Sequence, residues 1–390
     1  MSWMRREFLR RWGAGVTAAS LSGLLGCSNN QQTATSLQDD AALMTSVADL
    51  EERIPQLMTE LRVPGASISI ISNGRIAWRK SVGIRDHASG APVDDDTIFE
   101  AQSMSKPVFA YRVLKLAELG ILDLDAPLTK YAPELFLRGD SRLELVTARR
   151  VLSHTTGFPN WRSKEDPLRI NFTPGEKWSY SGEGYHYLQS VVTHLVGHTD
   201  AKNCGRFELQ YRLCASDFSD YMAANLLRPF GMMSSGYVWT EAIGKRMATA
   251  HDKNGRPAPR PKSTPLDVAR YGSAGSLLTT ATDYARFLLE IVDPKPPDAF
   301  RLNEASRREM LRPHVDVPGM PFKMSWALGW QIWHLPERDV VAHGGDIHGF
   351  HSQAAFSPAR RRGFVILTNG ENGSELISKH LLKDLVDQFA

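Results

Sequence analysis

The segment Ser103-Met104-Ser105-Lys106 places a hydroxyl group and an amine three residues apart, directly before a strongly helical run. Positions i and i+3 of a helix share a face, so these two side chains can meet. Burial would lower the pKa of the lysine, and its neutral amine could then take the proton of the serine. The N–H groups and the positive dipole end at a helix start favour a developing anion. This is the chemistry of serine acyl transfer.

An S-x-x-K pattern by itself recurs by chance, and its weight here comes from further segments in a fixed order along the chain. These are Leu152-Ser153-His154-Thr155-Thr156-Gly157, Pro174-Gly175 before Tyr180-Ser181, Ala274-Gly275-Ser276-Leu277, Leu328-Gly329-Trp330 and His343-Gly344-Gly345. In order and spacing the six segments resemble the superfamily of serine β-lactamases, penicillin-binding proteins and family VIII carboxylesterases, and its class C-like branch in particular. The resemblance covers roughly residues 45–385.

The resemblance implies roles for three side chains. Ser103 would be the nucleophile, Lys106 its activating base, and Tyr180 the tyrosine of the family's Tyr-x-Asn element, which relays a proton to the leaving group. The asparagine of that element is missing, because Gly182 stands in its place. Glu183 is a weak candidate to fill the space. The missing amide argues against efficient β-lactam turnover. It matters less for ester hydrolysis, which requires fewer contacts with the substrate.

The segment His343-Gly344-Gly345 stands where other members carry Lys-Thr-Gly, and its histidine form resembles esterase and D-aminopeptidase-like members. The two glycines would let a substrate backbone lie close along an exposed strand. By resemblance, the oxyanion hole joins the N–H group of Ser103 with that of Asp346. We expect His343 to take part in function.

Other histidines invite two further interpretations. His154 could be a catalytic base, but a lysine already fills that role, so we interpret it as structural, holding the loop between subdomains. His343, His348 and His351 with Asp346 could suggest a metal site, but their spacing fits no common zinc template. The sequence therefore predicts neither a metal nor another cofactor.

Hydrophobic periodicity predicts the elements that position these residues. A helix is expected over 42–61, then strands over 66–71 and 75–83 joined at Asn73-Gly74, and a helix after Ser103 that ends at Gly120. The stretch from about 121 to 265 reads as a mainly helical insert. Strands return over 327–335, 340–343, 353–356 and 363–367, and a helix over 376–389 closes the chain. The fold class predicted is α/β (α+β), with one antiparallel sheet built from both chain ends, flanked by helices.

The first residues indicate a targeting segment. Arg5-Arg6 opens a twin-arginine export signal, the apolar run over 12–25 is too short to span a bilayer, and Cys27 stands at a lipoprotein cleavage site. A plain cleaved signal with an incidental cysteine is the alternative. We assign 1–27 to this segment, 28–40 to a polar flexible linker and 41–390 to the hydrolase domain. The predicted location is the periplasm or cell envelope.

Charge and cysteine content limit the partners. Residues 1–26 carry a net charge of +3, which is that of the whole chain, so the remainder is close to neutral. Nothing therefore indicates a nucleic-acid partner, and contact with a membrane is expected only through the lipid anchor. Cys204 and Cys214 could pair in an oxidising compartment or remain free thiols.

The leading hypothesis is a serine hydrolase that cleaves an ester or amide of a small molecule or peptide through an acyl-enzyme on Ser103, and is most similar to esterases. One alternative is a D,D-peptidase or β-lactamase that acts on cell-wall peptides or β-lactams. Another is an envelope binding or sensor protein that acylates slowly or not at all. The presence of Ser103, Lys106 and Tyr180 together favours catalysis, because binding alone would not require all three.

Overall fold

The computed structural model describes residues 45, 47–131, 137–163, 167–196, 215–262 and 265–390. Cys27, Cys204 and Cys214 lie outside these residues, as do the targeting segment and the linker, so lipidation, export and the disulfide stay predictions. In the described part, no helix is long and apolar enough to cross a membrane.

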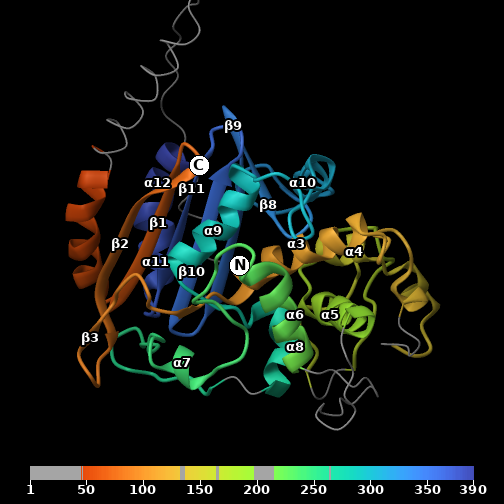
Figure 1. Ribbon diagram of the computed structural model, residues 1–390, viewed down its shortest axis with the longest axis horizontal. Coiled ribbons are helices and arrows are strands. Elements are labelled where there is room, and N and C mark those ends of the chain that lie inside the picture. The colour runs from red at the N-terminus through yellow and green to blue at the C-terminus, as the bar shows by residue number, and fades with distance from the viewer. Residues whose placement is uncertain (1–44, 46, 132–136, 164–166, 197–214, 263–264) are drawn as a thin grey trace, which may run out of the picture.

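The central element is an antiparallel sheet, nine-stranded within the described residues, in the order β3-β2-β1-β11-β10-β9-β8-β7-β6. Its strands are β1 (Gly65–Ser72), β2 (Arg75–Asp86), β3 (Ala91–Pro92), β6 (Val315–Asp316), β7 (Met324–Trp326), β8 (Gln331–Leu335), β9 (Arg338–Ile347), β10 (Phe350–Ser357) and β11 (Arg362–Thr368). A second small sheet pairs β4 (Phe99–Glu100) with β5 (Leu278–Thr279). Figure 1 shows the large sheet with helices on both of its faces.

The helices fall before, between and after these strands. They cover residues 47–61, α3 (Ser105–Glu118), α4 (Ala148–Leu152), α5 (Gly182–Val196), α6 (Ala215–Met222), α7 (Glu241–Gly244), α8 (Pro265–Gly275), α9 (Ala281–Val292), α10 (Glu304–Leu311), α11 (Gly373–Glu375) and α12 (Leu382–Phe389). Short 3₁₀ helices are η1 (Gln102–Met104), η2 (Leu128–Lys130) and η3 (Ser141–Leu145), and π-helical turns are η4 (Ala223–Leu227) and η5 (Leu376–Leu381).

Both ends of the described chain build the sheet, as predicted. β1 pairs with β11, with Ala66 opposite Thr368, and on its other side with β2. The β1–β2 hairpin turns at Asn73 and Gly74, which have φ angles of 51° and 69°. A two-residue turn with positive φ at both positions matches the strand twist, which explains why this dipeptide marks the hairpin.

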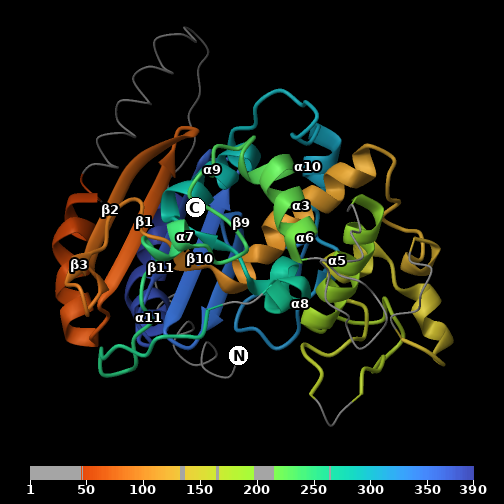
Figure 2. The same cartoon turned by 60° about the horizontal axis from the view of Figure 1, so that its bottom comes forward.

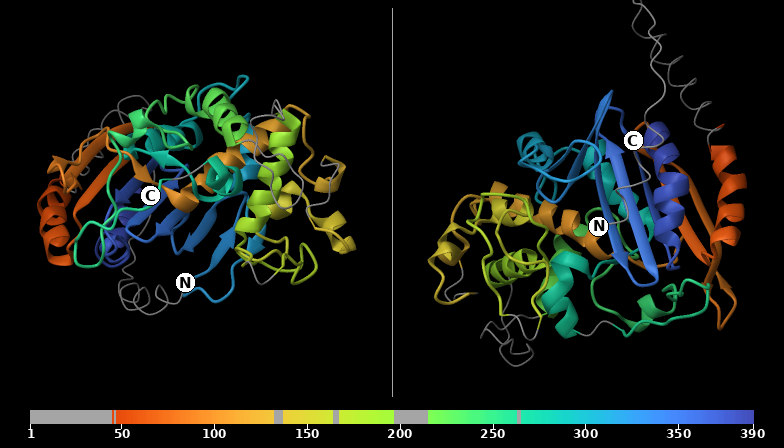
Figure 3. Two further views of the ribbon diagram at one scale, coloured as in Figure 1. Left: turned by 90° about the horizontal axis from the view of Figure 1, so that it is seen from below. Right: turned by 180° about the vertical axis from the view of Figure 1, so that it is seen from behind.

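Two apolar layers cover the sheet. On one face the helix over 47–61 buries Val47, Leu50, Ile54 and Met58, spaced three or four residues apart, together with the C-terminal helix α12. Figure 3 shows these first and last helices on one side of the sheet. On the other face α9 packs against β1 and β11, next to α3 and α8.

The helix α3 lies between the sheet and a group formed by α5, α6 and α8 (Figure 2). All of its residues from Ser105 to Leu116 are buried. Because the helix is covered on all sides, its charged side chains lie in the protein interior, and Lys106 is one of them. The range 121–265 contributes helices α4, α5 and α6 to this region, and its limits as a separate subdomain stay a prediction.

The late strands differ from the predicted ranges in two places. The range 327–335 is not one strand, because Ala327–Trp330 forms a turn between β7 and β8. Gly329 there has a φ of 87°, and a Cβ on it would come within 2.7 Å of the Ala110 Cβ on α3. β9 extends well beyond the predicted 340–343, because β10 pairs along it as far as Ile347.

Candidate active site

Ser103 lies in the single 3₁₀ turn η1, between β4 and the first turn of α3. The residue before it, Gln102, has a φ of 49° and donates from its side chain to Glu100 at 2.6 Å. A non-glycine residue with positive φ stores strain that the surroundings must support. Pro107 is the third residue of α3, where its missing N–H group has no helical partner to lose, so it starts the helix without breaking it.

Lys106 points from the first turn of α3 toward the serine. Its Nζ atom is 3.2 Å from Ser103 Oγ and donates to the carbonyl of Ala274, at the end of α8, at 2.7 Å. The side chain is almost fully buried, and burial lowers the pKa of Lys106 to about 7. A large fraction of this lysine is therefore a neutral amine near neutral pH, with a lone pair next to the Ser103 hydroxyl.

Tyr180 lies against both groups. The Lys106 Nζ atom is 4.8 Å from the centre of the Tyr180 ring, and the Tyr180 hydroxyl lies close enough to the Ser103 side chain for the serine to affect its pKa. Burial raises the pKa of Tyr180, and the negative charge of Asp346 adds to the effect. The phenol therefore keeps its proton near neutral pH and can donate it.

His154 holds the tyrosine segment in position. Its ring packs against the ring of Tyr180 with centroids 4.2 Å apart, and its Nδ1 atom accepts a hydrogen bond from the Ser181 backbone at 3.0 Å. Burial lowers the pKa of His154 well below its usual value, so the ring is neutral. The sequence predicts a structural role for this residue, and the structure adds its direct contact with Tyr180.

The strand β9 passes next to the turn that carries Ser103. β8 accompanies β9 only as far as the Gln331–Ala342 pair in the described sheet, so the edge of β9 beyond Ala342 faces the site. A Cβ on Gly345 would lie 2.2 Å from the Ala101 carbonyl oxygen, which is a clash. Glycine at this position therefore allows β9 to approach the backbone that precedes Ser103.

His343 is the first residue of the part of β9 that β8 does not pair with. Its Nδ1 atom donates to the Gly344 carbonyl at 2.7 Å, which leaves Nε2 as an acceptor, buried and without a hydrogen-bond partner among the described residues. Burial, assisted by the nearby charge of Lys106, lowers the pKa of His343 to about 3. The ring is therefore a neutral acceptor near Lys106 and does not replace a family lysine as a cation.

The histidines that follow are engaged separately. His351 Nδ1 is 2.7 Å from the Asp346 carboxylate, and His348 Nδ1 is 2.7 Å from Glu371. The Asp346 side chain is largely exposed, and only its backbone N–H group is a candidate oxyanion donor. Within the described residues, no cluster of His, Cys, Asp and Glu side chains is arranged to hold a metal ion.

The space left by the missing asparagine is filled by a tryptophan. A Cβ on Gly182 would lie 2.3 Å from Cζ2 of Trp161, and the Gly182 N–H group donates to the Asn160 carbonyl at 2.9 Å. Glu183 does not fill this space, as its carboxylate accepts bonds from Arg162 at 2.7 and 3.0 Å. Burial alone would raise the pKa of Glu183, but His186 and Arg162 hold it well below its usual value.

We predict that Gly182→Ala lowers the free energy of unfolding by about 1–3 kcal/mol, because the new methyl group overpacks the site. In a Trp161→Ala background the same change should stabilise the protein, because alanine is more favourable than glycine at a helical position by up to about 1 kcal/mol. Denaturant unfolding of the four proteins in a double-mutant cycle measures this coupling. Equal effects of Gly182→Ala in both backgrounds would contradict the contact.

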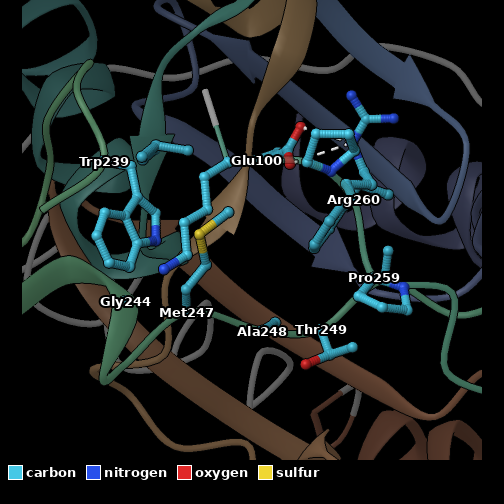
Figure 4. A pocket seen from close by; sticks show the side chains of 13 residues that line it. Glu100, Trp239, Gly244, Met247, Ala248, Thr249, Pro259 and Arg260 are labelled. Atoms are coloured by element: carbon cyan, nitrogen blue, oxygen red, sulfur yellow. Dashed lines mark hydrogen bonds and ion pairs between the residues drawn. The ribbon is translucent and has the colours of Figure 1, made fainter. Parts of the chain in front are cut away.

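A cavity of about 320 Å³ lies beside this site, between the loop that follows α7 and the start of β10. Figure 4 shows Trp239 on one side of it and Glu100 with Arg260 on the other. The Glu100 carboxylate binds Arg260 at 3.2 Å, and it also accepts the bond from Gln102. The cavity wall is therefore connected to the strained turn that precedes the serine.

The structure brings together Ser103, Lys106 and Tyr180, and places Gly344, Gly345 and the backbone of Asp346 along the neighbouring strand edge. The sequence does not predict two of the contacts in this site. The carbonyl of Ala274 binds Lys106, although its segment belongs to one of the six motifs, and Trp161 covers Gly182 without belonging to any motif.

Comparison with known proteins agrees with this geometry. A model of the beta-lactamase family matches residues 50–387. The chain is 26% identical over 367 residues to the human protein named putative beta-lactamase-like 1, covering 86% of this chain and 68% of the relative. It is 22% identical over 329 residues to Protein flp of Staphylococcus aureus, covering 79% of this chain and 60% of that protein.

Solved structures share the fold. A beta-lactamase/D-alanine carboxypeptidase from Pseudomonas syringae superposes with a TM-score of 0.72 at 19% identity, over 88% of this chain and 99% of the other. An octameric penicillin-binding protein homologue from Pyrococcus abyssi superposes with a TM-score of 0.67 at 24% identity, over 83% of this chain and 73% of the other. With a family match over most of its length and the fold of these proteins, the chain belongs to the beta-lactamase family of serine hydrolases.

Proposed function

We propose that this hydrolase cleaves esters through a covalent acyl-enzyme on Ser103. One observation carries the proposal: the Lys106 Nζ atom is 3.2 Å from Ser103 Oγ, and burial lowers the pKa of Lys106 to about 7. A neutral amine at hydrogen-bond distance from a hydroxyl group is the arrangement that general-base activation of a nucleophile needs.

In acylation, Lys106 takes the Ser103 proton as Oγ bonds to the substrate carbonyl carbon. The carbonyl oxygen becomes an oxyanion, and we assign its stabilisation to the backbone N–H groups of Ser103 and Asp346. Tyr180 donates its proton to the leaving alkoxide as the C–O bond breaks, and Lys106 returns a proton to the phenolate.

Deacylation repeats these steps with water as the nucleophile. Neutral Lys106 takes one proton of the water as the water oxygen attacks the acyl carbon, and the Lys106 ammonium returns that proton to Ser103 Oγ as the bond between Oγ and the acyl carbon breaks. His343 is a neutral acceptor beside this path, and we assign to it a substrate-orienting role with Gly344 and Gly345. No step uses a cofactor.

Esters are favoured over amides by the missing amide side chain. Gly182 offers no group to bind a substrate carbonyl, and Trp161 fills that space, so the site has fewer polar contacts for a peptide or β-lactam. A D,D-peptidase or β-lactamase is the second candidate. Its support is the strand edge of β9 beyond Ala342, along which an extended peptide could pair, and the D-alanine carboxypeptidase among the structural neighbours.

Side-by-side labelling separates these candidates. The protein is incubated with a fluorophosphonate and with a fluorescent penicillin, and its turnover of p-nitrophenyl acetate and of a D-Ala-D-Ala peptide is measured. We expect phosphonate labelling and ester turnover with little penicillin labelling. Stable penicillin labelling with peptide cleavage would support the second candidate, and no labelling by either probe would contradict the proposed acyl-enzyme.

The pH dependence tests the role of Lys106. Because the folded-state pKa of Lys106 is about 7, its neutral form dominates above that pH and is lost below it. We expect kcat/KM to fall about tenfold per pH unit on the acid side and to level off on the alkaline side. A profile measured with p-nitrophenyl acetate that stays flat from pH 5 to about 8 would contradict a neutral-lysine base.

A further inference from the structure

Two aromatic side chains next to Gly182, at the start of α5, are not used by the mechanism. The Trp161 indole is 37% exposed, although it lies against Gly182 at the start of α5. It meets Tyr271 of α8 edge to face, with ring centroids 4.8 Å apart. An exposed indole packed on a half-buried tyrosine ring is a surface that an apolar group can cover.

Each ring lies next to a helix that also contacts Lys106. Gly182 and Tyr185 share a face of α5, and the Tyr185 ring centre is 5.5 Å from the Lys106 Nζ atom. Tyr271 precedes by one turn Ala274, whose carbonyl binds the same Nζ atom at 2.7 Å. The two helices that contact the Lys106 amine, α5 and α8, are therefore the same two that the aromatic pair lies against.

The pair is also held rigidly. Asn160 and Arg162, on either side of Trp161, are both bonded to the start of α5: Asn160 through the Gly182 N–H group and Arg162 through the Glu183 carboxylate. The guanidinium of Arg270 lies 5.2 Å from the Tyr271 ring centre and 3.5 Å from the same carboxylate. A binding surface fixed in this way loses little conformational entropy when a ligand covers it.

We propose that Trp161 and Tyr271 form the acyl-group subsite of this enzyme and select substrates with an apolar, aromatic or aliphatic, acyl group. The inference rests on the proposed ester hydrolysis at Ser103. The indole takes the space in which an amide side chain would recognise a polar acyl substituent. Selectivity here comes from apolar contact with two rings.

The test compares p-nitrophenyl phenylacetate with p-nitrophenyl acetate, which share a leaving group and differ in the acyl side chain. In wild type kcat/KM should be higher for the phenylacetate ester than for the acetate ester. In Trp161→Ala the ratio of these two kcat/KM values should fall about 10-fold or more. Trp161→Phe should recover part of the ratio. Trp78→Ala, which removes a tryptophan of β2 that binds Glu51, is the matched control and should leave the ratio unchanged.

A second measurement does not depend on turnover. In a Ser103→Ala background, Trp161→Ala should weaken the affinity for phenylacetate about 10-fold while leaving that for acetate nearly unchanged, as measured by calorimetry or ligand-observed NMR. If wild type cleaves the esters but the ratio of the two kcat/KM values is unchanged in Trp161→Ala, the subsite proposal is wrong and the proposed function stands. Wild type that cleaves neither ester overturns the proposed function, and the affinity measurement then decides the subsite.

Discussion

Replacing Ser103 by alanine is expected to reduce kcat for p-nitrophenyl acetate by about 10⁴- to 10⁶-fold, the range seen when a serine nucleophile is removed from an enzyme that acts through an acyl intermediate. The reason is local: Ser103 is the hydroxyl that both Lys106 and Tyr180 contact, and alanine leaves these groups with nothing to activate. Steady-state rates and intact-mass analysis of the acylated protein are the measurements.

The neighbouring serine provides a matched control. Ser105 Oγ donates to the Gln102 carbonyl at 2.6 Å and accepts from the Leu277 N–H group at 2.9 Å, so it fastens the strained turn to the segment before β5. Ser105→Ala should cost about 1–3 kcal/mol of folding free energy but keep fluorophosphonate labelling. Labelling that survives Ser103→Ala and disappears in Ser105→Ala would show that the nucleophile has been assigned to the wrong residue.

The second large effect is expected from Lys106→Met, which should lower kcat/KM by about 10²- to 10⁴-fold, as the loss of a general base does. The same change should raise the stability of the fold. A buried lysine costs free energy through desolvation, and methionine of similar length fills the space without it. Ester kinetics and thermal unfolding of the same preparation measure both effects.

Lys106→Arg is the informative companion, because arginine keeps its proton and cannot act as a base. It should be as inactive as the methionine variant but less stable. The pH dependence of folding stability is a further test. The pKa of Lys106 in the folded state, about 7, lies below that of a free lysine, so between these two pKa values the unfolded chain binds more protons than the folded chain. Wild-type stability should rise from about pH 7 towards pH 10, and the methionine variant should lack this rise. A fully active arginine variant would contradict the mechanism.

The parts of the site that were predictable share a property: their residues are close in sequence. Ser103 and Lys106 are three positions apart, so helix geometry alone brings them together. The Asn73-Gly74 hairpin was predictable for the same reason, because its dihedral requirements belong to the dipeptide.

The parts that were missed depend on contacts between distant segments. The Ala274 carbonyl reaches Lys106 from 168 positions along the chain, and Trp161 covers Gly182 where the backbone and side chain of Asn160 accept hydrogen bonds from the start of α5. The full length of β9 was missed because its glycines weaken a strand signal, whereas pairing with β10 maintains the strand to Ile347. Glu183 was a poor candidate for the vacant position, because its partners Arg162 and Arg270 come from two other segments.

The pairing of β1 with β11 has a consequence for how the molecule forms. Ala66 and Thr368 are neighbours in the sheet, yet they are 302 positions apart in the chain. During synthesis β1 has an unsatisfied backbone edge until the last strands leave the ribosome, and the loop that must close is among the longest the chain offers. Folding should therefore be slow and late, and fragments that end before β11 should aggregate through that open edge.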